Sequence, residues 1–144
     1  MQLLVAGYAM TDLAERIKKA ARVYVIGNGG SYANAMHIAN DLIAVGIKAF
    51  TVDPATLTAA ANDYGWHQGF VRWIKTVGER GDLLIALSGS GTSQNILMAC
   101  EEAERIGMDV YRLFGAALGQ DMQAAEEYQI CTGHNLMRVL RDSR

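Results

Sequence analysis

The 144-residue sequence has few cysteines and a single proline. Cys100 and Cys131 lie far apart and form no Cys-x-x-Cys pair, so the sequence indicates neither a disulfide framework nor a zinc ribbon, and a reducing compartment is expected. No stretch approaches the ~18 consecutive apolar residues that a membrane span requires. The apolar run at 3–10 has no basic residue before it, unlike a signal peptide. We therefore expect a cytoplasmic protein with no membrane partner.

The sequence also lacks an excess of either charge. Thirteen Lys and Arg residues stand against fifteen Asp and Glu residues, which gives a formal net charge of -2 at pH 7. A nucleic-acid partner is not expected, because binding a polyanion requires a basic surface. With 51% hydrophobic and 19% charged residues the chain can build a sizeable core, and its length suits one domain over residues 1–144.

Short apolar runs alternate with longer segments of helical period, a pattern typical of βαβ units. The expected strands are residues 23–26, 48–52, 83–87, 110–114 and 128–131. The expected helices are a first one from about residue 12, then 31–45, 70–77 and 92–106, with a short helix and loop at 55–65 and a weakly patterned helix at 122–126. The sequence thus predicts a doubly wound α/β fold: a five-stranded parallel sheet with helices on both faces, in a flavodoxin-like three-layer sandwich.

Two of the expected strands end in loops of glycine and hydroxyl or amide residues that lead directly into a helix. The first loop reads Gly-Asn-Gly-Gly-Ser over 27–31, and the second reads Ser-Gly-Ser-Gly-Thr-Ser over 88–93. At the carboxyl ends of parallel strands, such loops and the following helix N-termini bind anions. We expect an oxyanion ligand, most simply a phosphate, although either loop alone is also consistent with an ordinary turn and helix cap.

Neither loop carries a nucleotide-binding signature. The third glycine of a Rossmann G-x-G-x-x-G is replaced by Tyr32 in the first loop and by Gln94 in the second. A Walker loop is excluded because no glycine is followed by lysine. A small phosphorylated metabolite is therefore expected as ligand, with no nucleotide cofactor.

The helix after the first loop carries a polar stripe of Asn34, His37 and Asp41. Its opposite, apolar face holds Ala35, Ile38, Ala39 and Leu42. Because His37 and Asp41 are four residues apart, both side chains can reach one small object, either a metal ion or a substrate hydroxyl. The alternative is a solvated helical face without function.

The loop at 27–31, the helix with His37 and Asp41, and the segments 62–65 and 88–95 follow one another in the order seen in the sugar isomerase (SIS) domain family. The sequence resembles this family from about residue 12 to 130. Within that family the sequence is most similar to the phosphoheptose isomerases. The resemblance implies conversion of sedoheptulose 7-phosphate to glycero-manno-heptose 7-phosphate through an enediolate, in heptose biosynthesis for lipopolysaccharide. The alternative is a non-catalytic SIS domain that binds a sugar phosphate or a partner protein as a regulator.

The resemblance also assigns site residues. The phosphate would be held by Ser88, Gly89, Ser90 and Ser93, where Gly89 replaces the hydroxyl residue usual in the family. The sugar would be contacted by Asn28, Gly29, Ser31 and Asp63. His37 falls on a zinc-binding histidine, and Asp41 falls on a glutamate that acts as general base but is one methylene longer. His37 and Asp41 are therefore the expected catalytic residues, and zinc is the expected metal on the same pair.

Besides the shorter side chain of Asp41, two features of the family are not matched. The final helix of the isomerases bears a glutamine and a histidine that complete the zinc site, and we expect His134 not to take the place of that histidine. The first residues are too few for the N-terminal helical hairpin through which family members assemble, although a homo-oligomer, dimer or tetramer, is still expected. His67 is expected to be a solvated capping residue.

Overall fold

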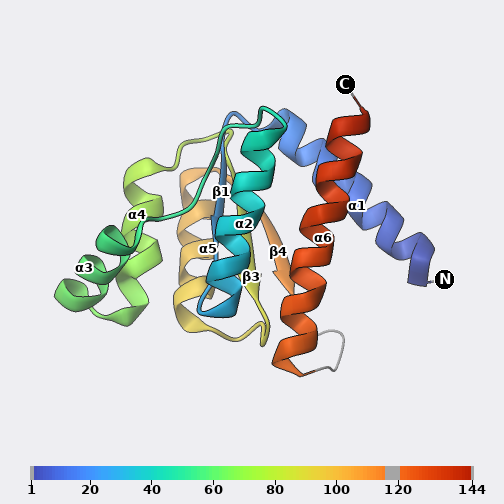
Figure 1. Cartoon of the computed structure of the whole chain (residues 1–144). Helices are drawn as coiled ribbons and strands as arrows, with labels where there is room; N and C mark the ends of the chain where they lie inside the picture. Colours follow the sequence, from blue (N-terminus) through green and yellow to red (C-terminus); the bar gives the residue numbers. More distant parts are fainter. Residues whose placement is uncertain (1, 116–120, 144) are drawn as a thin grey trace.

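The computed structural model describes residues 2–115 and 121–143, and places a four-stranded parallel sheet between two layers of helices (Figure 1). The strands are β1 (Val23–Ile26), β2 (Ala49–Phe50), β3 (Leu83–Ser88) and β4 (Asp109–Phe114). The helices are α1 (Gln2–Lys19), α2 (Gly30–Ala44), α3 (Pro54–Tyr64), the 3-10 turn η1 (Trp66–Gln68), α4 (Gly69–Val77), α5 (Gln94–Ile106) and α6 (Met122–Asp142). The sheet order is β2-β1-β3-β4, which is a doubly wound arrangement.

The central strands β1 and β3 are buried along their whole length, as expected for parallel strands covered on both faces. Val23 and Val25 pack against α1, α2 and α6 on one face. Tyr24 and Ile26 pack against α4 and α5 on the other. This alternation divides the core in two and confirms the predicted three layers.

The prediction of a fifth strand at 128–131 was wrong, because α6 runs without a break from Met122 to Asp142. Its buried residues recur every three or four positions, namely Ala125, Gln129, Thr132, Gly133, Leu136 and Leu140. That spacing is helical, and Asp121 caps the helix by accepting a hydrogen bond from the Ala124 amide. A window of four residues is too short to reveal this period.

Several boundaries also differ from the expectations. Helix α1 already begins at Gln2, so Asp12 lies within it and pairs with Arg16 instead of capping it. Helix α2 is capped by Gly29 rather than by Gly30 or Ser31. The second strand is reduced to Ala49–Phe50, and the segment expected as short helix and loop forms the full helix α3.

The fold places the ends of β1 and β3 side by side. The two strands pair in parallel with Ile26 opposite Ala86, so the loops that follow them emerge at the same edge of the sheet. Gly27 makes the turn into α2 possible, because a Cβ there would lie 2.6 Å from the Ser31 backbone. Within the described residues, no helix combines the length and the apolar character needed to cross a bilayer.

Candidate functional site

The two glycine-rich loops meet at the carboxyl edge of the sheet, as the sequence predicts. Asn28 in the first loop and Asn95 at the start of α5 exchange two side-chain hydrogen bonds, each 2.8 Å long. Asn95 is buried, and its amide oxygen also accepts from the Ile96 backbone. This reciprocal pair fixes the distance between the first turns of α2 and α5.

A small cavity of about 80 Å³ lies between the loops and the start of α6. It is lined by Asn28, Ser31, Leu87, Ser88, Gly89, Ser90, Ser93, Met122 and Glu126. Six of the predicted ligand residues are therefore gathered around one space. Asp63 is not among them: it is exposed at the end of α3, where its carboxylate accepts from the Asn62 amide. Gly29 adjoins the site as the N-cap of α2.

The serine hydroxyls around the cavity are arranged to donate hydrogen bonds. Ser88 Oγ accepts from the Gly91 amide at 3.0 Å, and Ser90 Oγ accepts from the Thr92 amide at 3.1 Å. Each hydroxyl also carries one proton, which it can donate to an oxygen of a ligand. Ser88 Oγ also lies 3.5 Å from Ser93 Oγ.

Two helix N-termini face this edge of the sheet. Neither the α2 cap Gly29 nor the α5 cap Ser93 uses a side chain to close its first turn. Gly29 has a φ of 54°, a conformation that favours glycine. Uncapped backbone N–H groups and the partial positive charge of a helix start attract an anion, so the cavity suits a phosphate group.

Gly89 lies close to the side chain of Met122. A Cβ added at Gly89 would overlap the sulfur of Met122, which covers this loop from the first turn of α6. Met122 itself is half exposed. The start of α6 therefore occupies the space that a side chain on the loop would need.

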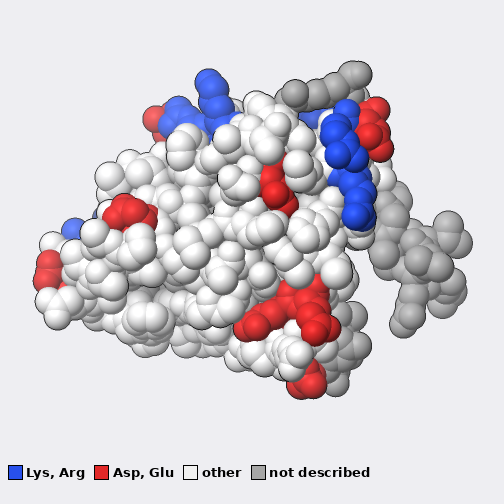
Figure 2. Space-filling model, in the orientation of Figure 1, with Lys and Arg blue, Asp and Glu red and all other residues white. Residues whose placement is uncertain are grey.

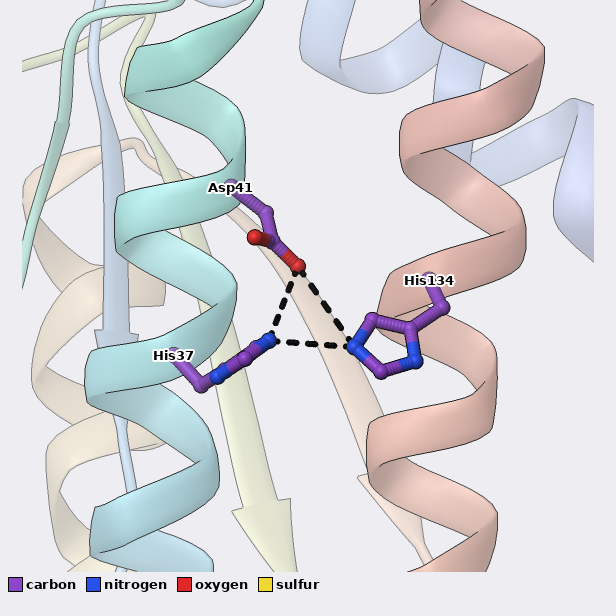
Figure 3. A group of neighbouring side chains, drawn as sticks. All are labelled: His37, Asp41 and His134. Carbon is purple, nitrogen blue, oxygen red and sulfur yellow. Dashed lines mark hydrogen bonds and ion pairs between the residues drawn. The ribbon is translucent and has the colours of Figure 1, made fainter.

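A second group of polar side chains lies between α2 and α6 (Figure 3). His37 Nε2 is 3.0 Å from His134 Nε2 and 3.3 Å from Asp41 Oδ2, and the distance from His134 Nε2 to Asp41 Oδ2 is 4.0 Å. His134, which was not expected to complete this group, lies in it. Because 128–131 is helical, α6 carries His134 to the same level as His37, and Gly133 lets the two helices approach closely at Ile38.

The polar stripe of α2 faces α6 and is only partly in solvent. Asp41 is buried, and its Oδ2 has no hydrogen-bond partner. One turn from the start of α2, the side-chain amide of Asn34 donates to the Glu126 carbonyl and to Gln129 Oε1. Gln129 Nε2 in turn donates to Ser31 Oγ. This chain of hydrogen bonds connects the cavity with the groove between α2 and α6.

The group of His37, Asp41 and His134 can hold a metal ion. Three ligand atoms on one tetrahedral zinc, with bonds of about 2.0–2.2 Å, lie about 3.3–3.6 Å apart. The three distances of 3.0, 3.3 and 4.0 Å bracket this range. Asp41 Oδ2 accepts no hydrogen bond and lies 3.3 Å from His37 Nε2, and a cation bound between these atoms would compensate the charge of the buried carboxylate.

Sequence reasoning missed three residues of this region: Glu126, Gln129 and His134. All three lie on α6, which was expected to be divided between a helix and a strand. The signal that could have found them is the helical spacing of the buried residues over the whole of 122–142.

The two cysteines stay outside the site. Burial raises the pKa of the Cys100 thiol to about 11, which makes it a poor nucleophile.

The comparisons with known proteins agree with this geometry. The family model described as SIS domain matches residues 7–115. The phosphoheptose isomerase of Akkermansia muciniphila is 39% identical over 120 residues, which cover 78% of this chain and 64% of that protein. The phosphoheptose isomerase of Thiobacillus denitrificans is 36% identical over 142 residues, covering 85% of this chain and 72% of that protein.

A solved structure shows the same relation. The phosphoheptose isomerase from Francisella tularensis superposes with a TM-score of 0.84 and 28% identity, covering 94% of this chain and 85% of that one. The chain spans less than two thirds of the length of the Akkermansia relative. The family match over most of the sequence nevertheless leaves one conclusion: the chain belongs to the SIS domain family.

Proposed function

We propose that the protein is a sugar-phosphate isomerase of the phosphoheptose type, interconverting sedoheptulose 7-phosphate and glycero-manno-heptose 7-phosphate in the cytoplasm. The observation that carries this proposal is that the anion cavity and the His–Asp–His group share helix α2. Ser31 lines the cavity, and His37 follows six residues later, about 9 Å along the helix axis. A sugar with a phosphate at one end and a carbonyl at the other can therefore occupy both.

The chemistry requires a base, an acid and a fixed substrate. Asp41 would take the proton from the carbon next to the carbonyl and return it to the neighbouring carbon, so that no proton is lost overall. With no ion bound, a histidine of the group, His37 or His134, would move the proton between the two oxygens of the enediolate. The hydroxyls of Ser88, Ser90 and Ser93 would hold the phosphate, and this remote binding would orient the reacting carbons.

Zinc is the metal we propose for this site. Two imidazole nitrogens and one carboxylate oxygen are ligands that zinc favours, and they leave a position open for substrate. When bound, the ion would polarise the substrate oxygens and stabilise the enediolate. His37 and His134 would hold it through Nε2 and Asp41 through Oδ2, so the other Asp41 oxygen would serve as the base.

We also propose that the protein assembles with copies of itself. Half-exposed apolar side chains lie on the outer sides of α2 and α6, namely Met36, Ile43 and Val139. Burying such side chains against a second copy would remove apolar surface from water. A measurement of the mass in solution tests this part.

The activity is tested with sedoheptulose 7-phosphate, with and without added zinc. Wild type should form heptose 7-phosphate, and Asp41→Asn should lower turnover by at least about 10²-fold because the amide cannot accept the proton. Phosphate affinity should change little, since Asp41 does not line the cavity. Asp142→Asn, an exposed carboxylate at the end of α6, is the control.

One observation favours the non-catalytic alternative. Asp41 is one methylene shorter than the family glutamate, and the shortening withdraws the carboxylate by about 1.5 Å from the substrate, enough to slow a reaction about 10²-fold. The alternative is therefore a SIS domain that binds the sugar phosphate as a regulator. If the protein binds sedoheptulose 7-phosphate in the presence of zinc but does not convert it, the regulatory function is supported.

A further inference from the structure

Glu126 holds a carboxylate against the first turn of α2. A Cβ added at Gly30 would overlap both oxygens of this carboxylate, so the glycine is what permits the approach. Glu126 also lines the anion cavity together with Ser31 and Ser88. Its negative charge therefore lies where the N–H groups and the dipole of α2 attract an anion.

Glu126 is the charged residue among those that line the described cavity; no lysine or arginine is among them. Figure 2 shows acidic side chains gathered over the beginning of α6, with no blue side chain over this part of the visible face. Asp121 and Glu127 are exposed on the same turns of the helix. An anion that enters the cavity thus meets helix N-termini and hydroxyls on one side and a carboxylate on the other.

We propose that Glu126 sets the ligand specificity of this cavity, by disfavouring anions that have no hydrogen to donate and admitting a phosphate ester that carries hydroxyl groups. The inference rests on the proposed function, because it takes the cavity to be the phosphate site. Two like charges in a partly buried space repel each other strongly. The hydroxyls of a sugar ester can donate to the carboxylate and offset this repulsion, whereas sulfate cannot.

The same physics explains why a charge serves better here than an amide. A buried hydrogen-bond acceptor of the protein is left unpaired when the ligand has no hydrogen to donate to it. Such a site therefore binds a ligand with a hydroxyl group much more tightly than an analogue that lacks the hydroxyl. Ionised Glu126 is purely an acceptor, while an amide could turn its N–H groups toward a bare anion. The carboxylate thus keeps the cavity available in the presence of other inorganic anions.

The test is a titration calorimetry series on the full chain, with sulfate and sedoheptulose 7-phosphate as probes at one pH and low salt. Glu126→Gln should bind sulfate between about threefold and tenfold more tightly than wild type. The affinity for the sugar phosphate should change less. The ratio of the affinity for sedoheptulose 7-phosphate to the affinity for sulfate should therefore be smaller in Glu126→Gln than in wild type. The gain for sulfate should shrink as salt is added, because screening weakens the repulsion that was removed.

Glu127→Gln, which removes an exposed charge on the next residue, should behave like wild type. Glu126→Ala is the second variant and should also bind sulfate more tightly. Unchanged or weaker sulfate binding in both Glu126 variants overturns the inference, and so does an equal gain for sulfate and ester. If wild type binds no sugar phosphate at all, the proposed function itself fails, which is a separate outcome.

Discussion

The buried carboxylate of Asp41 lies where it can take part in metal binding. Its carboxylate is buried between α2 and α6, and Oδ2 has no hydrogen-bond partner. Helix α6 brings His134 Nε2 to 4.0 Å from this oxygen. The oxygen therefore remains within the space that a single ion can share with two imidazoles.

The two cysteines provide a prediction at the same scale. Cys100 is fully buried on α5, and burial raises its thiol pKa to about 11, so the reactive thiolate is scarce at pH 8. Cys131 is exposed on α6. A thiol reagent such as Ellman's reagent should therefore modify one thiol per native chain quickly, and two after unfolding in guanidinium.

The variant Cys131→Ser is the control for this assay. It should remove the fast reaction and leave a thiol that reacts only on unfolding. Fast modification of the native Cys131→Ser protein would show that Cys100 is accessible, which would contradict the packing of α5 against the sheet.

At the scale of elements, the contact between α2 and α6 depends on Gly133. A Cβ at this position would lie 2.7 Å from Cγ1 of Ile38, which is buried in the core. Gly133→Ala should lower the free energy of unfolding by about 1 to 2 kcal/mol, because the overlap outweighs the better helix propensity of alanine. Urea denaturation measures this change.

A double-mutant cycle with Ile38→Ala shows whether the cause is this contact. Ile38→Ala alone costs stability by leaving a cavity, and adding Gly133→Ala to it should cost little more, because the clashing atom is gone. Strictly additive losses would mean that Gly133 acts elsewhere.

The same helix pair shows what the sequence could and could not predict. The strands at 23–26 and 83–87, the two loops and the position of His37 and Asp41 follow from local patterns of apolar and small residues. The role of α6 does not, because the short segment 128–131 fits the patterns of a strand and of a helix equally well. His134 could not be placed until that ambiguity was resolved by packing, which depends on contacts more than ninety residues apart in the chain.

For the whole molecule, the positions of the three candidate ligands link metal binding to global stability. His37 and Asp41 lie on α2, and His134 lies on α6, whose Leu136 and Leu140 belong to the core on that face of the sheet. An ion bound to all three would join two helices that unfolding must separate, so it would bind the folded chain far better than the unfolded one.

Zinc should therefore raise the thermal midpoint of wild type by about 5 to 10 °C when its free concentration is about 100 times the dissociation constant. His134→Ala should lose most of this shift, since one ligand is gone, while His67→Ala should keep it, because that exposed histidine in η1 lies far from the group along the chain. Differential scanning fluorimetry with zinc, and with magnesium as a comparison, measures the shifts. An equal rise in wild type and His134→Ala would place the ion elsewhere, and no rise in wild type would mean that this group of side chains does not bind zinc.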